Sequence, residues 1–309
     1  SWGEALGLIA LYRGRLDEAE RQLKLAAALV RPLDSGPLRL VTGELAMVHA
    51  LAGDERAMSA ALAESHQAQP GMLKPHIDEM RVHAAMRAST NDTRSACALL
   101  REHLERHPSL RPWSTAPILH DLVRYGAADD AAARLSELAE TFDGDLIAAW
   151  AHQAEAIAGG DFGALANAAE RFETMGCELD AAESWSTLAA WFRRRGARGD
   201  ERAATTAARR AADAIARCGG VRPRTPMLAD QPALDPLTDR EREVAQLVAS
   251  GLTDAEVAHR LQLSPRTVHA HLRAIYRKLG VVTRADLTDE LNAAAEGTTA
   301  SNATTRPRV

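Results

Sequence analysis

The sequence predicts an all-α protein, and three observations lead to this fold class. Hydrophobic residues make up 46% of the 309 residues but aromatic residues only 4%, so the apolar content is mainly alanine and leucine, which favour helices over strands. Short turn sequences recur at similar spacings between apolar runs. The chain is also too long for one ordinary hydrophobic core, which indicates several domains or an array of repeats.

Turn residues recur through the first two thirds of the chain at intervals of 33 to 39 residues. Glycine and asparagine tolerate the left-handed backbone that ends many helices. In four units an alanine follows five residues later, where a small side chain lets two helices approach closely. Each unit is therefore predicted to be a helix, a tight turn and a second helix. The turn residues are Gly14, Gly53, Asn91, Gly126, Gly159 and Gly196, and the alanines are Ala19, Ala96, Ala131 and Ala164.

The first unit carries the most complete pattern. Its pattern residues are Leu6-Gly7, Gly14, Ala19, Leu23, Ala26 and Pro32. This pattern resembles the tetratricopeptide repeat, and the resemblance extends over residues 1–218 through the turn positions. It implies a solenoid of helical hairpins whose concave surface binds an unknown small effector or protein. The alternative is a spacer or scaffold.

Residues 219–233 are predicted to form a linker between two domains. Gly219-Gly220 and the prolines at 223, 226 and 232 occur at a density that breaks helices. The repeat region would then end at residue 218, and a second domain would span residues 234–296. Residues 297–309 are mostly small and polar and are predicted to be a disordered tail.

The second domain contains three clear helix start signals. Thr238 and Thr253 are each followed three residues later by a glutamate, the pattern of a capping box. Ser264-Pro265 places serine at the cap and proline at the first helical position. With a last apolar stretch near Arg284, these signals predict a domain of four helices.

The third of these helices, over residues 265–279, has one apolar and one polar face. The residues at helical spacing that would face the core are Val268, Leu272, Ile275 and Leu279, and those that would project outward are His269, Ala270, Arg273 and Arg277. Residues 259–285 contain six basic residues and no acidic one, although the chain has a formal net charge of −5. Two short helices joined by a tight turn, with a basic second helix, predict a helix-turn-helix whose second helix enters the DNA major groove.

Residues 237–287 resemble the C-terminal DNA-binding domain of LuxR-type (also NarL-type) transcriptional regulators. The residues that carry the resemblance are Leu237-Thr238, Arg240-Glu241, Glu243-Val244, Gly251-Leu252, Glu256-Val257-Ala258, Leu261, Leu263-Ser264-Pro265, Thr267-Val268, His271, Ile275, Lys278-Leu279-Gly280-Val281 and Arg284. The promoter-reading region of sigma factors has a related helix-turn-helix. It lacks the Gly-Leu before the first of the two helices and the Lys-Leu-Gly after the second.

The resemblance implies roles for individual residues. Those expected to face bases are His269, Ala270 and Arg273, and those expected near the phosphate backbone are Ser264, Arg266, Thr267, Arg277 and Lys278. Glu241 matches the family's structural acid, and Leu287 and Leu291 lie on the helix that forms its dimer contact. Two positions depart from the usual pattern: His269 stands where lysine or glutamate is commoner, and Asp254 where asparagine is usual.

The sequence contains no motif for catalysis or for a resident cofactor. It has neither a phosphate-binding Gly-Lys loop nor a Gly-x-Ser-x-Gly elbow. His103 and His107 have a spacing that suits two metal ligands, but no third ligand accompanies them, so no metal site is predicted. We therefore expect a cytoplasmic protein that is not an enzyme, has no cofactor and does not enter a membrane.

These observations favour a bacterial DNA-binding transcriptional regulator. It resembles the last two parts of the large ATP-binding LuxR-type regulators, without their ATPase module. The repeats would sense an effector or partner, and a homodimer would bind a pseudo-palindromic site in double-stranded DNA. The alternative is a helical-repeat interaction scaffold with a degenerate helix-turn-helix.

Overall fold

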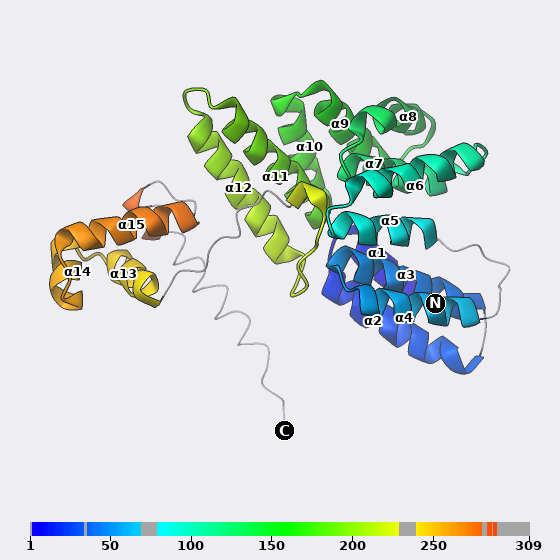
Figure 1. Cartoon of the computed structure of the whole chain (residues 1–309), viewed down its shortest axis with the longest axis horizontal. Coiled ribbons are helices and arrows are strands. Elements are labelled where there is room, and N and C mark those ends of the chain that lie inside the picture. The colour runs from blue at the N-terminus through cyan, green and yellow to red at the C-terminus, as the bar shows by residue number, and fades with distance from the viewer. Residues whose placement is uncertain are drawn as a thin grey trace. The chain divides into compact units, whose positions relative to one another are not determined.

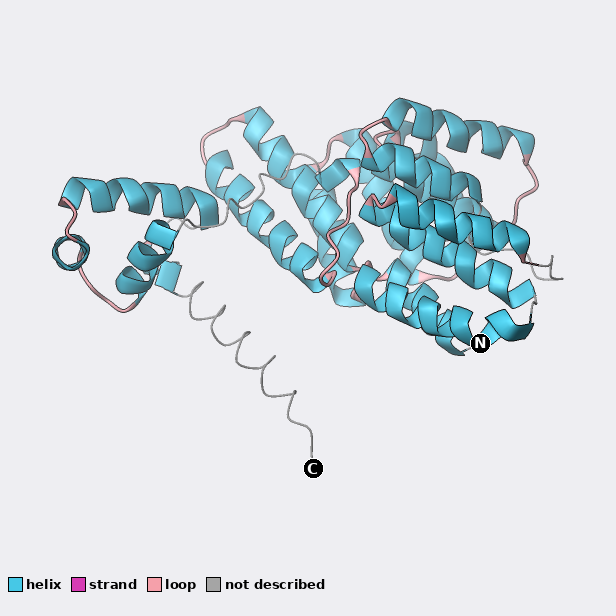
Figure 2. Cartoon of the chain, turned by 60° about the horizontal axis from the view of Figure 1, so that its bottom comes forward, coloured by secondary structure: helices cyan, strands magenta, loops and turns pink. Residues whose placement is uncertain are grey.

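The computed structural model describes residues 2–33, 36–68, 79–228, 239–279, 283–285 and 287–288. All regular secondary structure in this part of the chain is helical, which confirms the predicted all-α class (Figure 2). The chain divides into two compact units, one of residues 1–196 and 210–230 and the other of residues 197–209 and 231–309. None of the described helices combines the length and hydrophobicity that crossing a membrane requires.

The first unit is built of antiparallel helical hairpins (Figure 1). The first eleven helices are α1 (Trp2–Tyr12), α2 (Leu16–Val30), α3 (Gly36–Ala52), α4 (Glu55–Gln67), α5 (Glu79–Ser89), α6 (Thr93–Arg106), α7 (Pro112–Arg124), α8 (Ala128–Thr141), α9 (Asp145–Gly159), α10 (Phe162–Met175) and α11 (Glu178–Arg195). Helix α12 (Asp200–Arg217) follows, and short 3-10 helices, η1 (Arg31–Leu33) and η2 (Pro226–Leu228), come after α2 and α12. Each helix from α1 to α10 packs on a neighbour in sequence or on the next hairpin.

Most predicted turn residues have the left-handed backbone that a short helix-to-helix turn requires. Their φ angles lie between 63° and 94° at Gly14, Gly53, Asn91, Gly126 and Gly196. The prediction was wrong at Gly159, which is the last residue of α9, whereas Gly160 takes the left-handed conformation. The turn lies one residue later because Asp161 then caps α10, its carboxylate accepting from the Ala164 N–H at 2.9 Å.

The alanines predicted to lie between helices are buried in three of four units. Ala19, Ala96 and Ala131 have no exposed surface. Ala164 is half-buried, and the fully buried side chain at that turn of α10 is Leu165. The structure thus repeats the helical hairpin along the unit, while the specific resemblance to tetratricopeptide repeats stays a prediction.

The first hairpin contacts the start of α11 in the same unit. In the α1–α2 turn, the Arg13 carbonyl accepts from the Glu178 N–H at 3.0 Å. Gly14 packs directly on Leu179, with no room for a larger residue. Arg217 at the end of α12 forms an ion pair with Glu178 at 2.8 Å. The turn of the first hairpin therefore contacts the start of α11, although about 165 residues of chain separate them.

Part of the predicted linker packs on the repeat unit. The Arg224 N–H donates to the Leu51 carbonyl at the end of α3 at 2.7 Å, and Thr225 and Leu228 are buried. The η2 helix contacts α11. We call residues 219–228 the docked segment. The rest of the predicted linker and the predicted tail 297–309 lie outside the described residues.

In the second unit, three helices surround a small core. They are α13 (Asp239–Ala249), α14 (Asp254–Leu261) and α15 (Pro265–Leu279), so the third has the predicted bounds. The core residues, all at most 3% exposed, are Val244, Ala245, Val248, Val257, Ala258, Val268, Leu272, Ile275 and Leu287. The core aligns α15 against both shorter helices and leaves its opposite face open.

Candidate nucleic-acid interface

The first helix of the predicted helix-turn-helix, α14, begins with a complete capping box. The Thr253 hydroxyl accepts from the Glu256 N–H, while the Glu256 carboxylate accepts from the Thr253 N–H at 2.7 Å. The Thr253 N–H and hydroxyl both donate to the Glu256 carboxylate, and these two hydrogen bonds lower the pKa of Glu256. The box predicted at Thr253 is confirmed, whereas the one predicted at Thr238 lies outside the described residues.

The turn between α14 and α15 is held by backbone hydrogen bonds. Gln262 takes the left-handed conformation with φ of 53°. The Leu263 N–H reaches back to the Ala258 carbonyl at 2.8 Å, and the Gln262 N–H to the His259 carbonyl at 3.3 Å. This pairing satisfies the last carbonyls of α14 and fixes the direction in which the chain enters α15.

Ser264 caps the N-terminus of α15. Its hydroxyl accepts from the Thr267 N–H at 3.1 Å and lies 2.8 Å from the Thr267 hydroxyl. Pro265 occupies the first helical position, where no N–H is needed. Ser264 is exposed, so the positive end of the helix dipole faces solvent next to two hydroxyl groups. Such a helix end favours a phosphate group.

Helix α15 presents the predicted base-facing residues together on its open face. Val268, Leu272 and Ile275 are at most 3% exposed and lie in the core. His269, Ala270 and Arg273 are exposed on the other face, as is Arg266. His271 is half-buried between the two faces. The predicted phosphate contacts Arg277 and Lys278 belong to α15, but their side chains lie outside the described residues.

Asp254, at the start of α14, lies close to His269 of α15 and to Arg284, which follows that helix. Its carboxylate forms an ion pair with Arg284 at 2.7 Å and lies 4.0 Å from Nδ1 of His269. Arg284 also donates to the Leu252 carbonyl. The sequence marked both Asp254 and His269 as unusual for the family, but the ion pair with Arg284 was not predicted, because 30 residues separate the partners.

Two charged residues near the start of α13 differ in their surroundings. Glu241, the predicted structural acid, is buried at 6% exposure. Arg240, to which no role was assigned, donates to the Leu261 carbonyl at 2.6 Å and pairs with Glu243 at 2.7 Å. Arg240 thereby ties the start of α13 to the end of α14.

Of the two leucines expected on a dimer helix, the structure describes only Leu287. Leu287 is fully buried in the core of a single chain, so its side chain is already used within the domain. Leu291 lies outside the described residues. Leu287 therefore belongs to the domain core in addition to any role between subunits.

Comparison with known proteins finds relatives of this domain. Residues 235–291 match the luxR family of bacterial regulatory proteins. An HTH-type transcriptional regulator of Mycobacterium tuberculosis is 50% identical over 54 residues, which is 18% of this chain and 6% of that protein. The transcriptional regulatory protein UhpA of Escherichia coli is 49% identical over 53 residues, 17% of this chain and 27% of that protein.

The matched region is short relative to these proteins. A nitrate/nitrite response regulator protein homolog of Haemophilus influenzae is 45% identical over 51 residues, 16% of this chain and 24% of that protein. The chain thus matches less than a third of the length of each of these relatives. No solved structure matches the chain. The capped helices, their small core and the sequence match agree that residues 235–291 form a helix-turn-helix domain of the luxR family of bacterial regulatory proteins.

Proposed function

We propose that this protein is a bacterial transcriptional regulator that binds double-stranded DNA by inserting α15 into the major groove. The observation that carries the proposal is the open face of α15, where His269, Ala270 and Arg273 lie together in a 27-residue stretch, residues 259–285, with six basic residues and no acidic one. Arg273 would pair with the two acceptors of a guanine, and Ala270 would contact a thymine methyl group.

The remaining predicted contacts position α15 without reading sequence. Ser264 and Thr267 lie at the exposed helix N-terminus, and Arg266 is exposed one residue into it. These groups would contact phosphates, together with Arg277 and Lys278 near the other end of the helix. The position of the helix end supports this role, because Ser264 is exposed and the positive end of the helix dipole therefore faces solvent.

Asp254 is proposed to hold the His269 side chain in place on the DNA-facing surface. A free carboxylate at this position would repel phosphate, and the ion pair with Arg284 offsets that charge. Because His269 lies 4.0 Å from the same carboxylate, its ring is biased toward one side of the helix. The base preference at the position that His269 reads would then differ from that of regulators with lysine there.

The wider proposal concerns the whole chain. A homodimer would bind a pseudo-palindromic site in the bacterial cytoplasm, and the repeats, residues 1–218, would bind an effector or partner. The protein would act by binding rather than by catalysing a reaction. The match to families of regulators over the C-terminal domain supports this reading.

DNA binding by the full chain tests the proposal. Binding to a 30-base-pair duplex pool with random sequence should weaken steeply as salt is raised, because phosphate contacts release counterions. For duplexes selected from this pool by their binding to the unaltered protein, Arg273→Ala should weaken binding by roughly 1–3 kcal/mol. It should also relax the sequence preference at one base position. Arg87→Ala, which removes the same charge from an exposed position on α5, is the control and should bind as the unaltered protein does.

The alternative function makes a different prediction. If the helix-turn-helix is degenerate and the chain is an interaction scaffold, neither the unaltered protein nor Arg87→Ala binds the duplex pool even at low salt. That result would overturn the proposed function.

A further inference from the structure

Most of the exposed large hydrophobic side chains of the described residues lie on the first hairpin, α1–α2 (Figure 1). Elsewhere in the described chain only Trp113 of α7 is exposed to a similar extent. Apolar side chains that gather on one surface mark a site of interaction. The exposed fractions on the first hairpin are 88% at Trp2, 50% at Leu6 and 51% at Ile9 of α1, and 57% at Leu25 and 66% at Leu29 of α2.

These five side chains lie on the face of the hairpin that points away from the second hairpin, α3–α4. On α1, Leu11 and Tyr12 line a cavity together with Met47 of α3, so this side of α1 faces α3. On α2, Ala27 lines a groove together with Leu45 of α3. Because a helix turns through about 100° per residue, the exposed residues fall on the opposite side of each helix. We call Trp2, Leu6, Ile9, Leu25 and Leu29 the outer patch.

The composition of α1 indicates that this helix packs against other helices on both sides. Glu4 is the one charged residue among its eleven residues. A helix that is apolar all around its circumference is normally buried, whereas the end hairpins of a repeat array normally have a polar outer face. The outer patch therefore has the character of an interface between helices, rather than of an end that is exposed to water.

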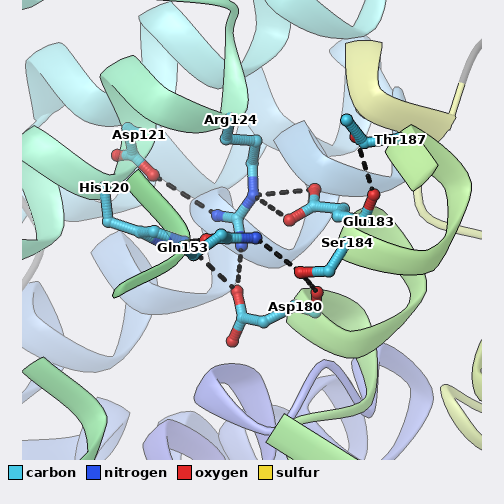
Figure 3. Close-up of polar contacts among 8 residues, drawn as sticks. All are labelled: His120, Asp121, Arg124, Gln153, Asp180, Glu183, Ser184 and Thr187. Carbon is cyan, nitrogen blue, oxygen red and sulfur yellow. Dashed lines mark hydrogen bonds and ion pairs between the residues drawn. The ribbon is translucent and has the colours of Figure 1, made fainter. Parts of the chain in front are cut away.

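The polar side chains inside the repeat unit do not offer a comparable contact (Figure 3). Arg124 of α7 donates from Nε to both carboxylate oxygens of Glu183 at 2.8 and 2.9 Å, and from Nη2 to Asp180 at 2.8 Å. Nε2 of His120 lies 2.9 Å from the Gln153 side-chain oxygen. None of these five side chains is more than 9% exposed. They pair with one another, so a partner of the folded unit contacts its outer surface instead.

We propose that the outer patch binds the outer patch of a second copy of this chain, so that the protein forms a homodimer through its first hairpin. The two hairpins pack around a two-fold axis, with the two α1 helices antiparallel at the centre. A two-fold contact of this kind requires that the surface be complementary to itself.

The row of side chains along α1 meets this requirement. Trp2, Leu6, Ile9 and Arg13 follow one another at spacings of four, three and four residues, as in the seam between two packed helices. Arg13 is exposed and continues the helical path, because its N–H donates to the Ile9 carbonyl at 3.0 Å. With the two-fold axis between Leu6 and Ile9, Leu6 faces the partner's Ile9, and Trp2 faces the partner's Arg13. A guanidinium group is attracted to the face of an indole ring.

The size of the outer patch is sufficient for a stable contact. At their exposed fractions the five side chains present on the order of 600 Å² of apolar surface per copy, so two copies would bury on the order of 1,200 Å². A specific interface between proteins needs about 1,000 Å² or more. The outer patch therefore reaches this size without a contribution from its neighbours.

This self-association takes place in the repeat unit and does not rest on the proposed DNA-binding function. Where that function holds, the contact would bring two helix-turn-helix domains to one pseudo-palindromic site. Leu287 would then remain in the core of its own domain, where the structure places it. The tests below contain no DNA, so a failure of DNA binding and a failure of this proposal are separate results.

Sedimentation equilibrium of the full chain measures the association. The average molecular mass should rise from that of one chain toward that of two as the concentration is raised from about 0.5 to 100 µM, a range suited to the smaller specific interfaces. High salt should not weaken the association, because the contact is mainly apolar.

Two variants and one matched control assign the association to the outer patch. Leu6→Glu and Ile9→Glu would each bury two unpaired carboxylates in the dimer, so the dissociation constant should rise at least about 100-fold. Trp113→Glu replaces an exposed large hydrophobic side chain outside the outer patch and should change the dissociation constant less than about twofold. All three positions are exposed, so circular dichroism should show unchanged helix content.

Disulfide trapping tests the antiparallel arrangement without adding a charge. The three native cysteines are buried, so they should not react in the folded chain. A mildly oxidised mixture of Leu6→Cys and Ile9→Cys chains should give more disulfide-linked dimer than either variant alone, because Leu6 faces the partner's Ile9. Trp113→Cys chains measure the background of random collisions.

Three results would overturn the proposal. The mass of a single chain at every concentration would assign the outer patch to a different partner. A dimer whose dissociation constant is the same in the unaltered protein and in both glutamate variants would place the contact elsewhere. Equal trapping in the mixture and in the separate variants would refute the antiparallel pairing of α1.

Discussion

Replacing Gly14 by alanine should destabilise the repeat unit by about 3 kcal/mol. Gly14 has φ of 76°, a conformation that costs an L-residue roughly 1–2 kcal/mol. A Cβ at this position would also lie 2.5 Å from Cβ of Leu179 and 2.7 Å from its backbone nitrogen. Because a backbone atom cannot rotate away, the first hairpin would have to separate from α11, and forced contacts of this kind cost about 1–3 kcal/mol.

Gly176→Ala is the matched control for this substitution. Gly176 also has a left-handed backbone, with φ of 69°, but an added Cβ meets no described atom within 4 Å. Its cost should therefore be the backbone term alone, roughly 1–2 kcal/mol. The difference between the two variants isolates the contact between the α1–α2 turn and α11, and should be about 2 kcal/mol.

Urea unfolding followed by circular dichroism measures both variants, and thermal unfolding should show a further decrease of about 4–8 °C in the Tm of Gly14→Ala relative to Gly176→Ala. If the two variants lose equal stability, the first hairpin does not contact α11 as described, and the reasoning from Gly14 is refuted.

Three further predictions concern other parts of the chain. Both carboxyl oxygens of Glu44 are buried without a hydrogen-bond partner among the described residues, and burial raises the pKa of this carboxyl to about 8. The folded state should therefore lose stability as pH rises from about 4 to 8, by at most about 1.4 kcal/mol per pH unit. Glu44→Leu should reduce this slope in urea titrations at pH 5 and pH 8, and an unchanged slope would contradict the assignment. Asp161→Ala removes the cap of α10 and should lower the free energy of unfolding by about 1 kcal/mol, whereas no loss would mean that the cap is not formed. Arg266→Ala should reduce by about 1 the slope of the logarithm of the DNA-binding constant against the logarithm of the salt concentration, with little change in base preference. A changed base preference would show that Arg266 reads bases.

Local features of the fold were predictable because their causes are local. Ser264-Pro265 and the apolar residues spaced along α15 gave its bounds correctly, since a cap, a proline and helical periodicity all act within a few turns. The left-handed turns at Gly14 and Asn91 were predictable for the same reason. The shift from Gly159 to Gly160 shows the limit: two adjacent glycines suit a turn equally well, and the cap at Asp161 decides between them.

Features that depend on distant contacts were not predictable from one sequence. Arg124 and Glu183 are separated by 59 residues, and each resembles an ordinary charged residue on a helix surface. The docked segment has the proline and glycine content of a free linker, yet Thr225 and Leu228 are buried because α3 and α11 form a surface beside it. Within the candidate interface, the open face of α15 was predicted, but the ion pair of Asp254 was not.

The contact between the first hairpin and α11 also changes how the repeat unit should fold. In an open array each repeat touches only its neighbours, so the ends can unfold separately from the middle. Here Arg13 and Glu178 pair across about 165 residues of chain, and this pairing forms only after the intervening hairpins bring the ends together. Such a distant contact slows folding and joins the repeats into one cooperative unit, whose end hairpins do not fray independently.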